Sequence, residues 1–150
     1  MTDNPAPLAQ PGAIHHVRLT VTDIARSKDF YGRLLGAGPA ADFSDQAGDP
    51  AVQKDPARLY GGCIFSVGEQ LLGLRPVAEV GDRFSSTRVG LDHLSLAVGS
   101  PDELSAAVAR LDAAGVEHGE ITELTGFGIA ILSVQDPDDI NLELTAPLPS

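Results

Sequence analysis

Two stretches of this chain repeat each other position for position, and this repeat constrains the fold more than any other feature. Residues 14–21 read IHHVRLTV and residues 91–98 read LDHLSLAV, each with a histidine in third place. Side chains on a strand alternate between its two faces. Each stretch therefore has one apolar face and one face that begins with a histidine, His16 or His93. The repeat predicts two strands that present equivalent histidines.

A third predicted strand, residues 141–145, adds a carboxylate to this pattern. Its two leucines alternate with the polar residues Asn141, Glu143 and Thr145. Two histidines and one carboxylate on strand positions that face the same site form the ligand set of an open mononuclear metal centre. We therefore take His16, His93 and Glu143 as candidate metal ligands.

Each histidine strand is followed by the same series of predicted elements. In the first half we expect one helix and up to three strands, at residues 24–35, 41–43, 59–67 and 70–75. In the second half we expect one helix from residue 101 and three strands, at residues 116–121, 128–134 and 140–144. Asp23 and Ser100 are the predicted N-caps, and Glu103 would complete a capping box with Ser100.

An internal repeat of this kind predicts an α+β fold of two βαβββ modules in tandem, whose sheets pair into a concave mixed sheet. We expect a flexible leader at residues 1–12 and a single domain at residues 13–147. That domain would consist of module 13–76, linker 77–90 and module 91–147. The polar side chains expected to face the hollow with the three ligands are Arg18, Arg75, Ser95, Asn141 and Thr145.

Composition narrows the classes of partner. The formal net charge of −11 opposes binding to nucleic acid or to an anionic membrane surface. Cys63 is the single cysteine, so the chain forms no internal disulfide, and a reducing cytoplasm is the expected location. The N-terminus has no basic region followed by an apolar run, so it does not read as a signal peptide. We expect a small-molecule substrate or drug as partner.

The residues around these strands resemble the vicinal oxygen chelate superfamily, over about residues 13–147. This superfamily includes glyoxalase I, extradiol dioxygenases, fosfomycin resistance enzymes, methylmalonyl-CoA epimerase and bleomycin resistance proteins. The residues that carry the resemblance are His16, Val17, Leu19, Val21, Asp23, Ser27, Phe30, Tyr31, Leu35, Gly36, Asp136, Pro137, Asp138 and Glu143.

The resemblance implies a divalent metal whose ligands come from the first and last strands of each module. Those positions are His16, Gly73, His93 and Glu143 here, and glycine has no side chain to bind metal. The glyoxalase I pattern is thus broken, and the three remaining ligands resemble the His, His, Glu set of dioxygenase-like and fosfomycin-resistance members. The metal implied is Fe(II), Mn(II), Zn(II) or Ni(II), and whether water fills the position at Gly73 is left open.

The function expected from this resemblance is a metal-dependent enzyme acting on a small oxygenated substrate by bidentate chelation. An extradiol-type dioxygenase or a related lyase or isomerase fits best, with Glu143 as the catalytic ligand. Arg18 and Arg75 would pair with a substrate carboxylate or a developing oxyanion, and Ser95 and Asn141 would also contact substrate.

Two other functions are left open: a metal-free protein that sequesters an antibiotic, as bleomycin resistance proteins do, and a structural or regulatory module with a vestigial site. The resemblance favours a homodimer. Modules paired within one chain and modules swapped between two chains are both compatible with the sequence.

Overall fold

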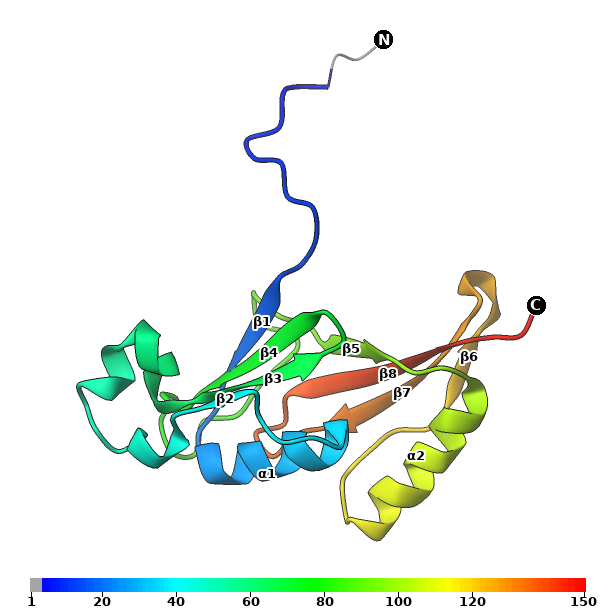
Figure 1. Cartoon of the computed structure of the whole chain (residues 1–150). Coiled ribbons are helices and arrows are strands. Elements are labelled where there is room, and N and C mark those ends of the chain that lie inside the picture. The colour runs from blue at the N-terminus through cyan, green and yellow to red at the C-terminus, as the bar shows by residue number, and fades with distance from the viewer. Residues whose placement is uncertain (1–3) are drawn as a thin grey trace. The chain divides into compact units, whose positions relative to one another are not determined.

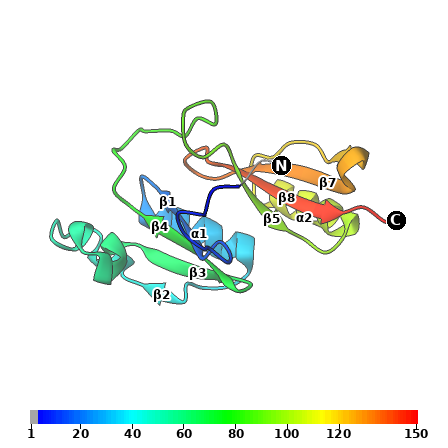
Figure 2. The same ribbon diagram turned by 90° about the horizontal axis from the view of Figure 1, so that it is seen from above.

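A computed structural model describes residues 4–150 and divides the chain into two compact units, unit 1 ending at Val77 and unit 2 beginning at Ala78. Figures 1 and 2 show the ribbon in two views. Each unit has a sheet and an α-helix of its own. The predicted division into modules 13–76 and 91–147 with a linker between them stays a prediction, although residues 76–93 contain no helix or strand.

Unit 1 contains a four-stranded mixed sheet and one α-helix. Its strands have the order β1-β4-β3-β2, with β1 parallel to β4 and the other pairs antiparallel. The regular elements are β1 (His16–Thr20), α1 (Ile24–Leu35), β2 (Ala41–Asp42), β3 (Cys63–Val67) and β4 (Gln70–Arg75). Three short 3-10 helices between β2 and β3 are η1 (Ser44–Gln46), η2 (Val52–Lys54) and η3 (Pro56–Gly61).

Unit 2 repeats this topology. Its strands have the order β5-β8-β7-β6, again with the first pair parallel and the others antiparallel. The elements are β5 (Leu94–Ala97), α2 (Pro101–Ala113), β6 (Thr122–Leu124), the 3-10 helix η4 (Thr125–Phe127), β7 (Ile129–Gln135) and β8 (Asn141–Pro147). The prediction of an α+β fold with two tandem βαβββ modules is therefore confirmed.

Each sheet has one face covered by its helix and one face free of it (Figure 1). In unit 1 the covered face is apolar and buried, with Leu19, Cys63, Phe65, Leu72 and Leu74 on its strands and Tyr31 on α1. In unit 2 the corresponding buried residues are Ala130, Leu132, Val134, Leu142 and Leu144 on the strands and Leu104 and Leu111 on α2. Burial raises the pKa of the Cys63 thiol to about 12, so this cysteine is an inert part of the core.

The two helices begin with different caps. Asp23 is the N-cap of α1, and its carboxylate accepts a hydrogen bond of 3.1 Å from the backbone N–H of Arg26. Ser100 occupies the N-cap position of α2, but its side chain makes no capping hydrogen bond. The predicted capping box is wrong because the Glu103 carboxylate instead lies 3.5 Å from Arg110, further along the helix.

Two strand predictions were wrong in part. The strand expected at residues 59–67 begins only at Cys63, because Asp55 and Pro56 start the 3-10 helix η3 just before it. The strand expected at residues 116–121 is reduced to a single bridge between His118 and Val134. The His118 ring is bound instead to Asp112 at the end of α2, which ties this segment to the helix.

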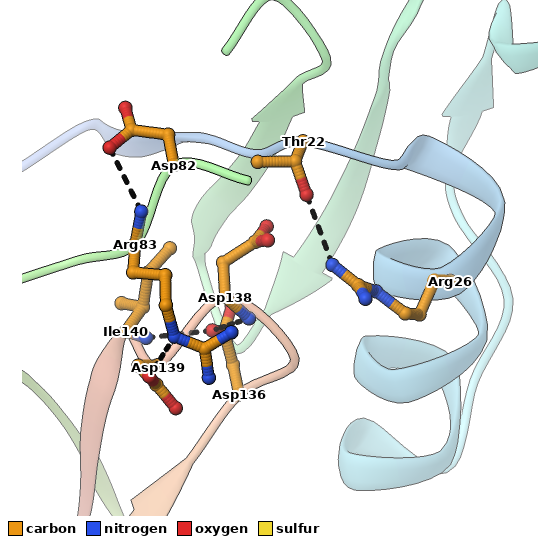
Figure 3. Close-up of polar contacts among 8 residues, drawn as sticks. All are labelled: Thr22, Arg26, Asp82, Arg83, Asp136, Asp138, Asp139 and Ile140. Atoms are coloured by element: carbon orange, nitrogen blue, oxygen red, sulfur yellow. Dashed lines mark hydrogen bonds and ion pairs between the residues drawn. The ribbon is translucent and has the colours of Figure 1, made fainter. Parts of the chain in front are cut away.

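The turn between β7 and β8 fixes how β8 enters the sheet (Figure 3). The Asp136 carboxylate accepts hydrogen bonds of 2.8 Å from the backbone N–H groups of Asp138 and Ile140. Asp139 has a φ of +63°, as its place in the turn predicted, and its carboxylate binds Arg83 Nε at 2.6 Å. This turn therefore sets the register in which β8 presents Glu143.

The predicted leader, residues 1–12, falls partly on residues 1–3, which lie outside the described residues, and its remainder contains no helix or strand. Within residues 4–150 no helix combines the length and apolar character that a membrane span requires.

Candidate functional site

Two of the predicted ligands lie close together on the open face of unit 2. His93 directly precedes β5, and Glu143 lies on β8 next to Ser95 in the parallel register. The His93 Nε2 atom is 3.7 Å from the Glu143 Oε2 atom. Two donors bonded to one metal ion at about 2.1 Å lie about 3.0–3.4 Å apart. A shift of a few tenths of an ångström would thus let this pair share an ion.

Both side chains are oriented by outer partners. His93 Nδ1 lies 2.7 Å from an oxygen of Asp92, so Nδ1–H donates to this carboxylate and Nε2 is directed to Glu143. Thr145 donates to the other Glu143 oxygen, Oε1, at 3.2 Å. Because the Thr145 hydroxyl has one proton, the Ser95 hydroxyl, 2.5 Å away, must donate to Thr145.

The electrostatics of the pair are those of a cation site. The hydrogen bond to Asp92 and the negative charge of Glu143 raise the pKa of His93, although partial burial opposes the rise. Carboxylates that bond the second nitrogen of a histidine and hydroxyls that bond a ligating carboxylate are typical outer partners of metal centres. The donor set and its supports in unit 2 therefore fit a divalent metal.

The third predicted ligand, His16, lies in unit 1 at the start of β1 and is exposed. Its Nδ1 atom is 2.8 Å from Nδ1 of His15, and the two rings meet edge to face. Among residues 4–150, no group of three or more His, Cys, Asp and Glu side chains is gathered closely enough to hold a metal ion. The structure thus brings together His93 and Glu143 within unit 2, and His16 as their third ligand stays a prediction.

In unit 1 the counterpart of Glu143 is Gly73, and the side chain of Arg18, from the neighbouring strand, fills the space beside it. Gly73 pairs with Arg18 in the β1–β4 register, as Glu143 pairs with Ser95 in unit 2. A Cβ atom placed on Gly73 would lie 3.1 Å from Arg18 Nε and 3.5 Å from Arg18 Cγ. The absence of a side chain at Gly73 therefore lets Arg18 lie across the sheet.

Arg75 shares this face, two residues after Gly73 on β4. Its guanidinium carbon lies 3.8 Å from the centre of the Tyr60 ring, and that of Arg18 lies 5.3 Å from the same centre. The Arg75 Nε atom is buried and has no hydrogen-bond partner within residues 4–150. The open face of unit 1 is therefore cationic.

Tyr60 is held over the two arginines by an unusual turn. Leu59, Tyr60 and Gly61 have successive φ values of +51°, +58° and +79°. A left-handed conformation costs a non-glycine residue about 1–2 kcal/mol, and such strain persists where the surrounding structure enforces it. The backbone at Gly62 packs so closely on β4 that a Cβ atom there would lie 1.7 Å from the Leu74 carbonyl oxygen.

The remaining predicted contact, Asn141, is the first residue of β8, and its side-chain oxygen accepts a hydrogen bond of 3.1 Å from Gln135 Nε2. Sequence reasoning missed Asp92 and Tyr60. The signal for Asp92 was its place directly before His93. No signal marked Tyr60, because it stands in a stretch whose pattern predicted a strand.

Known proteins share both the sequence pattern and the fold of this chain. The family model of the Glyoxalase/Bleomycin resistance protein/Dioxygenase superfamily matches residues 13–144. The chain belongs to this superfamily. No protein of curated function is similar enough in sequence to be matched.

Several solved structures are similar to this one. A glyoxylase/bleomycin resistance protein/dioxygenase domain from Frankia sp. EAN1pec is 27% identical, with 93% of each chain covered and a TM-score of 0.66. A putative glyoxalase from Bacillus halodurans is 20% identical, with 91% of this chain and 96% of that chain covered and a TM-score of 0.64. A mutant of the fosfomycin resistance protein FosX from Listeria monocytogenes, in complex with Mn(II) and 1S,2S-dihydroxypropylphosphonic acid, is 16% identical, with 93% and 94% covered and a TM-score of 0.67.

Proposed function

We propose that this protein is a metal-dependent enzyme of the superfamily, acting on a small oxygenated substrate that binds the metal through two oxygens. An extradiol-type dioxygenase or a related lyase or isomerase is the activity we favour. The proposal assigns His93 and Glu143 of unit 2 and His16 of unit 1 as ligands, from one chain or from two chains of a homodimer.

The observation that carries this proposal is the His93–Glu143 pair. Its facing atoms are 3.7 Å apart, and each side chain is oriented by a hydrogen bond on its far side, from Asp92 or Thr145. A pocket that only sequesters a drug has no need of such a pair. The Mn(II) in the FosX complex adds support, because the two proteins share a fold.

When bound, the divalent metal would act as a Lewis acid toward substrate oxygens. The residues of the chain supply the rest. By accepting a hydrogen bond from Nδ1, Asp92 leaves the His93 Nε2 atom available to bind a metal ion. Thr145 holds the Glu143 carboxylate so that its other oxygen faces Nε2. Arg18, Arg75, Ser95 and Asn141 are proposed to contact the substrate. A cytoplasmic location belongs to the same proposal, supported by the buried, unpaired Cys63.

The test is the metal content of protein purified without chelator, measured by elemental mass spectrometry. We expect about one transition-metal ion per chain, lost in His93→Ala. The matched control is His118→Ala, which removes another histidine that is paired with a carboxylate, Asp112, at 2.6 Å. A His16→Ala variant tests the third ligand separately.

The identity of the metal then directs the search for the reaction. Iron would favour oxygen-dependent ring cleavage, whereas nickel, zinc or manganese would favour lyase or isomerase chemistry. Retention of full metal content in His93→Ala would remove the ligand assignment. No metal, even after reconstitution with each of these ions, would contradict the proposal and would turn the search to antibiotic binding.

A further inference from the structure

The open face of unit 1 carries two arginines, Arg18 and Arg75, and no carboxylate of residues 4–150 is paired with either of them. The chain has 21 acidic and 10 basic residues, so carboxylates are in excess. Other cations of the chain are paired with them, including Lys28 with Asp42, Arg58 with Asp55 and Arg83 with Asp139. Within residues 4–150, neither Arg18 nor Arg75 forms an ion pair with a carboxylate.

The two arginines converge on one aromatic ring. Their guanidinium carbons lie 5.3 Å and 3.8 Å from the centre of Tyr60. Stacking on a ring uses the face of a guanidinium and none of its N–H donors. Arg75 Nε is buried without a partner in the described part of the chain, so a donor in this cluster is left unsatisfied.

Two features of the backbone hold this arrangement in place. Gly73 leaves the space across which Arg18 lies, and the left-handed turn at Leu59 and Tyr60 places the ring beside Arg75. Two like charges near one ring repel each other, and a negative group between them would relieve that repulsion. Planar guanidinium groups bind carboxylate and phosphate oxygens through paired, charge-assisted hydrogen bonds.

We propose that Arg18, Arg75 and Tyr60 form a binding site for an oxyanionic group, either a carboxylate or a phosphoryl-type group. As an anion site it stands on unit 1 alone. Its role as the subsite for one end of the substrate rests on the proposed function. Arg75 and Arg18 bind the oxygens, and Tyr60 is a positioning residue that fixes the plane of the Arg75 guanidinium.

The test uses the full chain, freed of metal by a chelator, and the ¹⁵N–¹H resonances of the arginine Nε–H groups. Acetate and benzoate probe carboxylate binding, while inorganic phosphate and methylphosphonate probe phosphoryl binding, all at constant ionic strength. We expect a saturable shift of the Arg75 resonance, identified by its loss in Arg75→Lys. The stronger of the two probe classes identifies the oxyanion.

Variants separate binding from folding. Arg75→Gln and Arg18→Gln should each weaken binding about tenfold or more, whereas Tyr60→Phe, which keeps the ring, should bind as the wild type does. Tyr60→Leu should weaken binding while its far-ultraviolet spectrum is unchanged. The matched control is Arg33→Gln on α1, since Arg33 is exposed and lies 4.0 Å from Asp29.

No saturable shift with any probe, or undiminished binding in Arg75→Gln, would overturn the proposal. Metal content is measured on the same protein before the chelator is added, so that the two sites are tested separately. A protein that binds the anion but no metal would therefore disprove the metal centre and keep this site, and the reverse result would disprove this site alone.

Discussion

The two units share one topology and one strand register, yet their open faces have opposite character. Three of the equivalent pairs that differ carry this contrast, namely Arg18 and Ser95, Gly73 and Glu143, and Arg75 and Thr145. Unit 1 thus has cations and a vacant Cβ position where unit 2 has hydroxyls and a carboxylate. One sheet is suited to an anion and the other to a cation.

The covered faces do not differ in this way. Leu72 and Leu74 of β4 correspond to Leu142 and Leu144 of β8, and all four are buried against the core. A buried apolar position admits few substitutions without a cost in packing, whereas a position on the open face is free of that demand. The two units therefore match where packing holds each of them together, and they differ on the faces available to ligands.

The largest effect should come from removing the hydroxyl that orients Glu143. Thr145→Val keeps the branched shape of the side chain but breaks the hydrogen bond to Glu143 Oε1 and the bond with Ser95. Loss of such an outer partner should lower metal affinity about 10- to 100-fold. Competition titration with a chelating dye measures the affinity.

Thr122→Val on β6 is the matched control, because the Thr122 hydroxyl donates to the nearby Glu120 carbonyl, at 3.4 Å, and not to a candidate ligand. Equal affinities in wild type and Thr145→Val would show that Thr145 does not orient the carboxylate. The two open faces would then differ only in the charges that they carry, the arginines of unit 1 and the carboxylate of unit 2.

A smaller effect should distinguish the two helices. Asp23→Ala removes a side chain that caps α1, and it should lower the free energy of unfolding by about 1 kcal/mol. Ser100→Ala removes a side chain that makes no capping bond, and it should cost less than about 0.5 kcal/mol. Urea unfolding monitored by circular dichroism measures both, and equal losses would contradict the difference in caps.

The smallest effect should be a pH dependence peculiar to unit 2. Hydrogen bonds to Asp112 and to the Gly119 carbonyl raise the pKa of His118. A raised pKa contributes stability below the ordinary value of about 6.5, and this stability is lost as the pH rises through the raised value. His118→Gln should therefore destabilise the protein more at about pH 5.5 than at about pH 8.5.

Urea unfolding of wild type and variant at the two pH values measures this difference. Asp112→Asn should reproduce it, since the bond that raises the pKa needs both partners. If His118→Gln lowers the free energy of unfolding equally at both pH values, the hydrogen bond to Asp112 does not favour the charged imidazole of His118.

Much of the fold followed from the sequence, because local signals agreed with the repeat. The helix at residues 24–35 and the strand at residues 70–75 have the bounds that were predicted. Asp23 and Gly36 mark the ends of that helix with side-chain and backbone chemistry that depends only on nearby residues. The apolar faces of the strands were likewise predicted by simple alternation.

The site was less predictable, because its geometry depends on contacts between residues far apart in the sequence. His93 was predicted as a ligand from its place in the repeat and Glu143 from the alternation of its strand, but the orientation of the two side chains depends on Asp92 and Thr145. The role of Tyr60 was not visible, since it arises from a left-handed turn inside a stretch with the pattern of a strand. The caps show the same limit, because Ser100 has the right residue type without the hydrogen bond.

Gly73 also has a consequence for how such a chain can change over generations. Glycine codons that end in a purine become glutamate codons by a single base substitution. One such mutation would place a carboxylate at position 73. A side chain at Gly73, however, would meet Arg18, whose Nε lies 3.1 Å from the Cβ position, and a carboxylate there would pair with that cation. A carboxylate at position 73 is therefore accommodated only if the Arg18 side chain moves or is replaced, which couples the two positions in evolution.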